Sequence, residues 1–267
     1  MVITRVERHE FYSVLLFPSM QPEVLPARSQ GVLDFRLKDC CTLAAVAIAV
    51  YGVVTAFEGD IPRASACVLF TWVFDALDGA VARLTGGGTD FGAKFDDVVD
   101  HVGYSVAPGF IVFAAFRDYS WTLGLALCMY LIAIGSVRLA RSLTRPLSYP
   151  GYWIGLPRSA AAFTICFFLS SRMFHVGQLY VPAALLVLVL GAMLLTYLPY
   201  RNHKAPMGPW GKLLWLVPVV SVGARPTGYM WDIALFFALV YLTTPLFYVS
   251  RAEKKSIDAA VLAWKRG

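Results

Sequence analysis

Residues 75–100 read DALDGAVARLTGGGTDFGAKFDDVVD, a stretch that places acidic side chains inside two otherwise apolar runs. Asp75 and Asp78 are three residues apart near the end of one run, and Asp96 and Asp100 are four apart at the start of the next. Residues at these spacings share one face of a helix. The polar link TGGGTD should fold the two helices into a hairpin, so we expect the four carboxylates to converge at one depth.

The rest of the chain indicates a membrane protein. Hydrophobic residues make up 58% of the sequence, and the mean hydropathy is +0.63. Apolar runs close to the roughly 17 to 25 residues that cross a bilayer recur along the chain. Helices are expected, because an open sheet in lipid would leave backbone groups unpaired. The predicted fold is an all-α integral membrane protein with spans at 42–57, 62–84, 93–117, 120–141, 158–175, 178–199, 207–224 and 229–250.

The basic residues give an orientation. If the N-terminus is cytoplasmic, all but four of the 23 Lys and Arg residues fall on the cytoplasmic side, as the positive-inside rule predicts. An even number of spans then places both termini in the cytoplasm. We assign the net charge of +6 to this topology and to anionic lipid headgroups, not to nucleic-acid binding. Three regions are predicted: a cytoplasmic or interfacial segment (1–40), a six-helix membrane core (41–200), and two further spans with a basic tail (201–267).

The acidic hairpin predicts a metal site. A charge at the bilayer centre costs about 2.5–3.5 kcal/mol, so four neighbouring carboxylates need a cation to hold them. Mg²⁺ or Mn²⁺, which prefer oxygen ligands, would serve. Gly79, Ala82 and Gly92 have almost no side chain and leave room for a ligand, and Arg83 can bind a phosphate through two hydrogen bonds. The simpler alternative is a solvated turn between helices with incidental acids.

The spacing of these residues matches a known pattern. The motif D-x2-D-G-x2-A-R-x8-G-x3-D-x3-D is filled by Asp75, Asp78, Gly79, Ala82, Arg83, Gly92, Asp96 and Asp100. On this motif the chain resembles the CDP-alcohol phosphotransferases. The resemblance implies a six-helix core, a CDP-linked lipid as substrate, CMP as leaving group, two metal ions and a homodimer. It also implies metal binding by Asp75, Asp78 and Asp96. Asp100 would be the base that deprotonates the acceptor hydroxyl, in contact with the second ion.

Further segments bear on the acceptor. VGYSVAPGF (102–110), GSVRLARSLTRP (135–146) and GYWIGLPRSAAAF (151–163) resemble the phosphatidylserine synthases within this family. The resemblance implies serine as acceptor. Arg138, Arg141 and Arg158 are predicted to converge at the cytoplasmic mouth and to hold the lipid phosphate or the acceptor carboxylate, unless they are positive-inside charges paired with headgroups. Two places depart from the pattern: TLAA (42–45) has Ala44 and Ala45 where the family often carries an Asn, and Arg158 replaces a small residue or proline. Asp97 is an extra acid on a different helix face.

Other functions remain open at this stage. The same chemistry could use inositol phosphate, glycerol phosphate or choline as acceptor. A membrane prenyltransferase would need two acidic motifs on distant helices, whereas here all four acids lie in one hairpin. A cation carrier would distribute its charges over several spans or repeats. In a prokaryote the expected location is the cell membrane.

Overall fold

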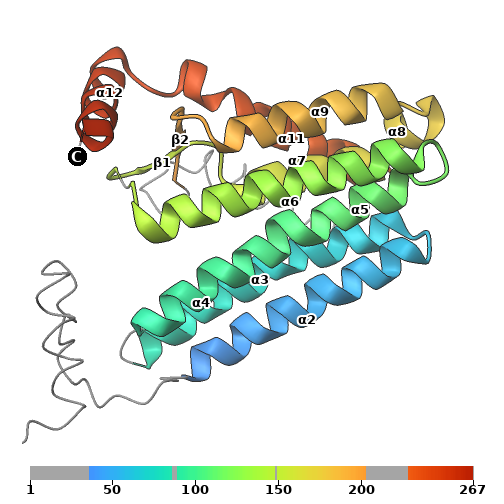
Figure 1. Ribbon diagram of the computed structural model, residues 1–267, viewed down its shortest axis with the longest axis horizontal. Coiled ribbons are helices and arrows are strands. Elements are labelled where there is room, and N and C mark those ends of the chain that lie inside the picture. Colours follow the sequence, from blue (N-terminus) through green and yellow to red (C-terminus); the bar gives the residue numbers. More distant parts are fainter. Residues whose placement is uncertain (1–35, 86–88, 148, 203–227, 267) are drawn as a thin grey trace, which may run out of the picture. The chain divides into compact units, whose positions relative to one another are not determined.

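The computed structural model describes residues 36–85, 89–147, 149–202 and 228–266 (Figure 1). Most of the predicted N-terminal segment (1–35), the linker glycines 86–88 and the predicted span at 207–224 lie outside these residues.

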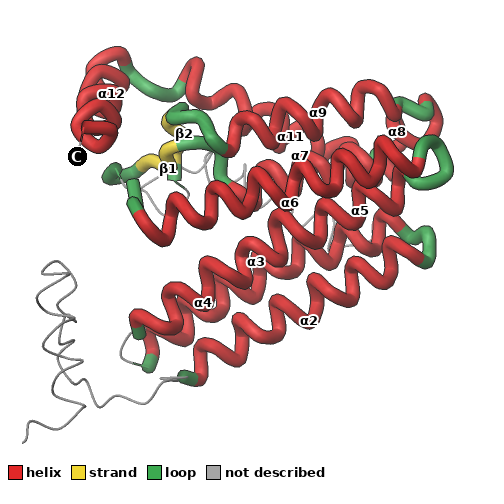
Figure 2. Tube along the Cα trace, viewed as in Figure 1, coloured by secondary structure: helices red, strands yellow, loops and turns green. Residues whose placement is uncertain are grey.

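The described part of the chain is almost entirely helical, as Figure 2 shows. Its helices are α2 (Leu37–Phe57), α3 (Ile61–Leu84), α4 (Asp90–His101), the π-helical turn η1 (Val102–Val106), α5 (Ala107–Phe116), α6 (Trp121–Thr144), α7 (Arg158–Ser170), α8 (Arg172–Gly177), α9 (Tyr180–Leu194), α11 (Gly228–Phe247) and α12 (Arg251–Arg266). Two short strands, β1 (Tyr152–Ile154) and β2 (Pro199–Arg201), pair antiparallel.

The predicted all-α membrane fold is confirmed. Within the described ranges, five helical stretches are long and apolar enough to cross a bilayer: Leu37–Phe57, Ile61–Leu84, Asp90–Phe116, Trp121–Thr144 and Tyr229–Phe247. The third combines α4, η1 and α5. Helices α7 and α9, with 13 and 15 residues, are shorter than the spans predicted at 158–175 and 178–199. The total of eight spans therefore stays a prediction.

Local capping signals set where the helices of the site begin. The Asp39 carboxylate accepts a hydrogen bond of 2.7 Å from the Arg36 backbone N–H, so α2 begins at Leu37, five residues before the predicted span. The Thr89 side chain accepts a hydrogen bond of 3.0 Å from the Gly92 N–H and caps α4. These caps fix the first turns of two helices that face the acidic cluster.

Helix α7 is the most buried helix of the core. It packs against α3, α5, α9 and α11, and the small residues Ala160–Ala162 on it allow close approach. Buried hydrogen bonds join α7 to α3. Ser65 of α3 donates one of 3.2 Å to the Cys166 carbonyl and receives one of 2.9 Å from Ser170. This packing holds the N-terminus of α7, where Arg158 lies, against the acidic region.

The long helix that carries the second pair of acids widens after His101 into the π-helical turn η1. The Ala107 N–H bonds to the Val102 carbonyl, five residues back, and Pro108 in the next position has no N–H to continue the regular ladder. Turns of this kind are frequent at functional sites. Here the turn lies directly after Asp100 and orients Tyr104 towards α7, where its ring meets Phe163 edge-on at 5.8 Å.

Candidate active site

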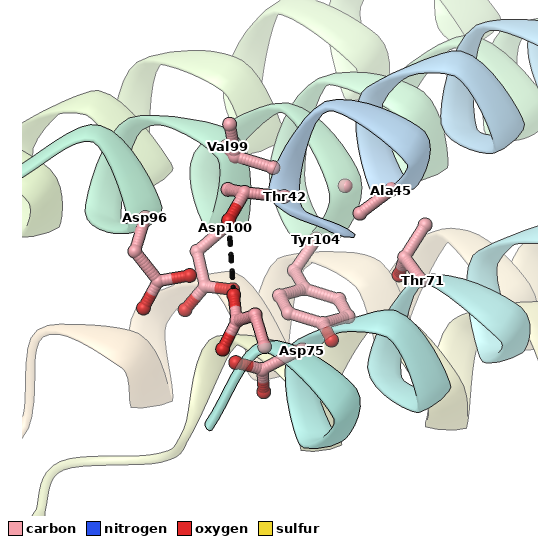
Figure 3. Close-up of a pocket in the computed structure, with 10 residues that line it drawn as sticks. Thr42, Ala45, Thr71, Asp75, Asp96, Val99, Asp100 and Tyr104 are labelled. Carbon is pink, nitrogen blue, oxygen red and sulfur yellow. Dashed lines mark hydrogen bonds between the residues drawn. The ribbon is translucent and has the colours of Figure 1, made fainter. Parts of the chain in front are cut away.

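Three of the four predicted acids form a cluster. One carboxylate oxygen from each of Asp75 and Asp78 on α3 and Asp96 on α4 lies within 4.8 Å of the others. Asp100 lines the same small pocket, and in Figure 3 its carboxylate points into the space shared with Asp75 and Asp96. Asp78 is buried and the other three are half-buried. The structure therefore brings together all four acids of the sequence motif, with Asp100 beside the closest three.

Thr42 of α2 is a neighbour of the cluster that sequence reasoning missed. Its hydroxyl donates a hydrogen bond of 3.0 Å to Oδ2 of Asp78, drawn as a dashed line in Figure 3. Thr42 is 1% exposed, so the bond is shielded from solvent. A neutral donor on one carboxylate oxygen holds the group in a fixed orientation. The signal in the sequence was one of two threonines in the apolar run 42–57, which alone does not indicate a ligand.

The donor set fits a divalent cation. Three carboxylates whose oxygens lie within 4.8 Å of one another offer the hard oxygen ligands that Mg²⁺ and Mn²⁺ prefer. The buried ammonium of Lys38 pairs with Oδ1 of Asp39 at 3.0 Å. The cluster is thus a candidate metal centre at one end of α3.

Of the two motif glycines, Gly79 borders open space and Gly92 is closely packed. A Cβ built on Gly79 would meet only Arg83 Nη1, at 3.6 Å, so the α3 backbone is open there. Ala82 is half-buried and Arg83 is exposed on the same helix. The binding of a ligand at these positions stays a prediction.

The structure explains why a glycine stands at position 92, where α4 packs closely against α2. A Cβ at this position would lie 2.5 Å from Lys38 Nζ and 2.9 Å from Asp39 Oδ1. A Cβ there would force the Lys38 or Asp39 side chain to shift, so glycine lets this buried pair of α2 pack against α4 as it stands. Gly92 therefore sets how closely α2 and α4 approach beside the cluster.

A larger cavity of about 390 Å³ adjoins the acids. Asp75, Asp96 and Asp100 line it on one side, together with Asp97. Its remaining lining comes mostly from the end of α6, from β1 and from the start of α7, and includes Arg138 and Arg158. The cavity thus carries both signs of charge and opens onto the candidate metal centre.

Arg158 joins the two sides of this cavity. Its Nη2 lies 2.8 Å from Asp97 Oδ1 and 3.4 Å from Asp100 Oδ2, and its Nη1 donates to the Asp97 carbonyl at 3.3 Å. The Arg158 side chain is 10% exposed, which strengthens these contacts relative to a surface pair. Arg158, which departs from the subgroup pattern, therefore contacts both Asp100 and the extra acid Asp97.

The two arginines of α6 are placed differently. Arg138 lines the cavity, and its Nη1 donates a hydrogen bond to the Leu194 carbonyl at the end of α9. Arg141 donates to the Leu195 carbonyl at 3.3 Å and stacks over Tyr197, and it is not among the described residues that line the cavity. The expected convergence of three arginines is thus found for Arg138 and Arg158.

Tyr104 is a second residue that sequence reasoning missed. It lines both the small pocket of the acids and the larger cavity, and its side chain lies beside Asp75 in Figure 3. Tyr104 is 6% exposed, so its side chain is shielded from solvent beside the acids. Neighbouring His101 instead packs against α6, with Nε2 3.3 Å from Ser136 Oγ.

Comparison with known proteins gives the family. The model of the CDP-alcohol phosphatidyltransferase family matches residues 36–198. The chain is 30% identical to a CDP-diacylglycerol–serine O-phosphatidyltransferase of Helicobacter pylori over 141 residues, which are 51% of this chain and 60% of that protein. A protein of the same name from Methanocaldococcus jannaschii is 28% identical over 159 residues, 58% of this chain and 72% of the relative.

The chain is also similar to a protein whose name gives a different acceptor from serine. A phosphatidylinositol phosphate synthase of Mycobacterium tuberculosis is 34% identical over 134 residues, 48% of this chain and 62% of that protein. The matched region contains every residue of the acidic motif, and it decides against a prenyltransferase or a cation carrier. The chain belongs to the CDP-alcohol phosphatidyltransferase family.

Proposed function

We propose that this protein transfers a phosphatidyl group from a CDP-linked lipid to the hydroxyl of serine and releases CMP. The observation that carries the proposal is a cluster of three acids, with Asp100 beside them, next to a cavity of about 390 Å³ lined by charges of both signs. The names of the relatives from H. pylori and M. jannaschii support serine as acceptor.

In this proposal Asp75, Asp78 and Asp96 hold one divalent ion, and Asp100 shares a second with them. When bound, Mg²⁺ or Mn²⁺ would screen the charge of the diphosphate and stabilise the oxygen of the departing CMP. The open backbone at Gly79, with Ala82 and Arg83 one turn further along α3, would accommodate the diphosphate. Gly92 would contribute by keeping α2 and α4 close.

Asp100 is the proposed base. Its carboxylate would take the proton of the acceptor hydroxyl as that oxygen forms a bond to the phosphorus of the lipid. The bond between this phosphorus and the CMP oxygen breaks, CMP leaves with the electron pair, and the proton ends on Asp100. The contact of 3.4 Å from Arg158 holds the carboxylate in one orientation towards the cavity.

The charges of the cavity favour an amino-acid acceptor. Free serine carries a carboxylate and an ammonium group, so its site needs a cation and an anion. Arg138 and Arg158 offer guanidinium donors for the carboxylate, and Asp97 offers an acceptor for the ammonium. Inositol phosphate would use the arginines for its phosphate but would offer Asp97 only neutral hydroxyl groups and no cation. This difference is the physical reason to prefer serine over the acceptor in the name of the mycobacterial relative.

The proposal places both chain termini in the cytoplasm and takes the lipid substrate directly from the bilayer. The excess of Lys and Arg in the segments assigned to the inside supports this orientation. A homodimer in the cell membrane of a prokaryote completes the proposal.

A direct test uses purified protein with CDP-diacylglycerol and a panel of acceptors: serine, inositol phosphate, glycerol phosphate and choline. CMP release is measured with and without divalent cations. We expect cation-dependent release that requires serine. Release that requires another member of the panel would overturn the choice of acceptor, and release without any divalent cation would overturn the proposed metal chemistry.

A further inference from the structure

We propose that the C-terminal helix α12 is a positioning element for the acceptor cavity, an inference that rests on the proposed function. Helix α12 (Arg251–Arg266) lies outside residues 36–198, which match the family model. It is nevertheless docked on the segment that closes one side of the cavity, beside β1 and β2 in Figure 1.

The cavity wall concerned is the chain between α6 and α7. Leu147, Trp153 and Ile154 of this segment line the cavity. Strand β1 holds the wall by pairing with β2, with Trp153 opposite Tyr200. A pair of three-residue strands is marginally stable by itself and needs packing against another element. The wall therefore depends on what lies behind it.

Helix α12 supplies that packing. Ile257 and Val261 are four residues apart on one helix face and form an apolar cluster with Tyr152 and Ile154, against which Leu147 also packs. Ile257 is fully buried and Val261 is 7% exposed. Leu147 and Ile154 thus belong both to the cavity lining and to the cluster with α12. A loss of packing behind them moves the cavity surface directly.

Hydrogen bonds secure the N-terminal half of α12 to the same wall. The Tyr152 hydroxyl donates to Glu253 Oε1 at 3.0 Å, and the hydroxyls of Tyr149 and Ser256 lie 2.8 Å apart. Both tyrosines belong to the wall segment. These bonds fix the rotation of α12 that directs Ile257 towards the wall.

The C-terminal end of α12 is secured to the end of α6. Arg145, the residue after α6, donates a hydrogen bond of 2.7 Å to the Trp264 carbonyl, and its guanidinium lies 4.7 Å from the centre of the Trp264 ring. A cation on a terminal carbonyl of a helix is favourable. Lys265 lies 4.2 Å from the ring centre of Tyr197, which also packs on the apolar cluster. Helix α12 therefore spans the wall from β1 to the end of α6.

The expected consequence is selective for the acceptor. The three clustered acids lie on α3 and α4, and Leu147 and Ile154 line only the larger cavity and not the pocket of the acids. A loosened wall should therefore weaken the binding of the acceptor while binding of the CDP-lipid is retained. A helix that served stability alone would affect both substrates together.

The test measures kcat and KM for serine and for CDP-diacylglycerol in the full-length protein, with Tm recorded for each variant. Ile257→Ala and Val261→Ala should each raise the KM for serine about tenfold and leave the KM for the CDP-lipid within about twofold. Ile257→Val retains most of the buried side chain and should restore the wild-type value. Leu262→Ala is the matched control, because Leu262 lies on the same helix and is 55% exposed.

Tyr152→Phe keeps the aromatic ring and removes only the bond to Glu253, so it tests the inference in a variant with little risk to folding. We expect a rise of roughly threefold in the KM for serine. Unchanged KM values for serine in Ile257→Ala and Tyr152→Phe would overturn the inference alone. Equal rises for both substrates, accompanied by a lowered Tm, would do the same. Wild-type protein without acceptor-dependent CMP release would overturn the proposed function and this inference with it.

Discussion

The clustered acids of the site come from one helical hairpin, whereas the lining of the adjoining cavity comes from α3, α4, α6, β1 and α7. The acids need only the correct spacing on two consecutive helices to meet. The cavity needs the end of α6, the strand pair and the start of α7 to be held together by packing elsewhere. Changes among the acids should therefore abolish turnover, and changes around the cavity should alter which acceptor is used and how tightly.

The largest effect is expected from removal of the metal. Four carboxylates around one space repel one another unless cations hold them, and the diphosphate adds further negative charge. Treatment of the purified protein with EDTA should reduce CMP release to background, and added Mg²⁺ or Mn²⁺ should restore it. Full turnover in EDTA would show that the hairpin acids serve another purpose.

Asp100→Asn is expected to have the next largest effect. The amide cannot accept the proton of the acceptor hydroxyl, so turnover should fall about 10³-fold. Binding of CDP-diacylglycerol, measured by titration calorimetry, should remain. Asp90→Asn is the control, since Asp90 is an exposed acid at the start of the same helix. If Asp100→Asn keeps full turnover, Asp100 is not the base.

Substitutions of Arg138 and Arg141 test whether the cavity lining determines how the acceptor binds. Both donate to a carbonyl at the end of α9, and of the two only Arg138 lines the cavity. Arg138→Ala should raise the KM for serine roughly tenfold or more, because a bond from a charged donor to the carboxylate is lost. Its effect on the KM for the CDP-lipid should be small.

Arg141→Ala removes an equivalent bond to α9 without changing the cavity lining, so it serves as the matched variant. Equal effects of the two substitutions on both substrates would assign Arg138 to the fold. A selective effect of Arg141→Ala on serine would instead support the acceptor role predicted for Arg141 from the sequence.

The same contrast explains how much of the site the sequence predicts. The positions of Asp75, Asp78 and Asp96 follow from helical periodicity across one short connection, and a motif records them completely. The contact between Asp97 and Arg158 joins residues 61 positions apart, which no local spacing reveals. Thr42 and Tyr104 were missed for a related reason. A threonine in an apolar run and a tyrosine after an aspartate have many ordinary uses, and only packing places them beside the acids.

The fold shows the same limit. Hydropathy predicts long apolar helices well, because each has to satisfy its own backbone in lipid. It overestimated the lengths of α7 and α9, because the apolar runs continue past Ser170 and Leu194, where these helices end. The strand pair β1–β2 carries no such signal, because two strands of three residues are too short for an alternating pattern.

Asp97→Asn tests a residue that lies on α4 with the proposed catalytic acids but lines the acceptor cavity. The substitution keeps a polar group near Arg158 and removes the charge proposed to meet the ammonium of serine. The Asp97 side chain is 34% exposed, so the expected effect is modest, a rise of about threefold in the KM for serine. Turnover at saturating serine should change little. A loss of turnover as large as that of Asp100→Asn would place Asp97 among the catalytic acids.

The smallest expected effect concerns pH and the attachment of α12. Hydrogen bonds from the Ser250 hydroxyl and backbone N–H, and from Tyr152, lower the pKa of Glu253 below its usual value of 4.5. A lowered pKa means that the ionised carboxylate stabilises the folded protein above pH 4.5, and that this contribution is lost as the pH falls through the folded-state pKa. The Tm difference between wild type and Glu253→Gln should therefore favour the wild type at neutral pH and shrink in acid. A difference that stays constant across this range would mean that the charge of Glu253 does not contribute, and that any role of this residue in holding the cavity wall depends on neutral hydrogen bonds that glutamine can also make.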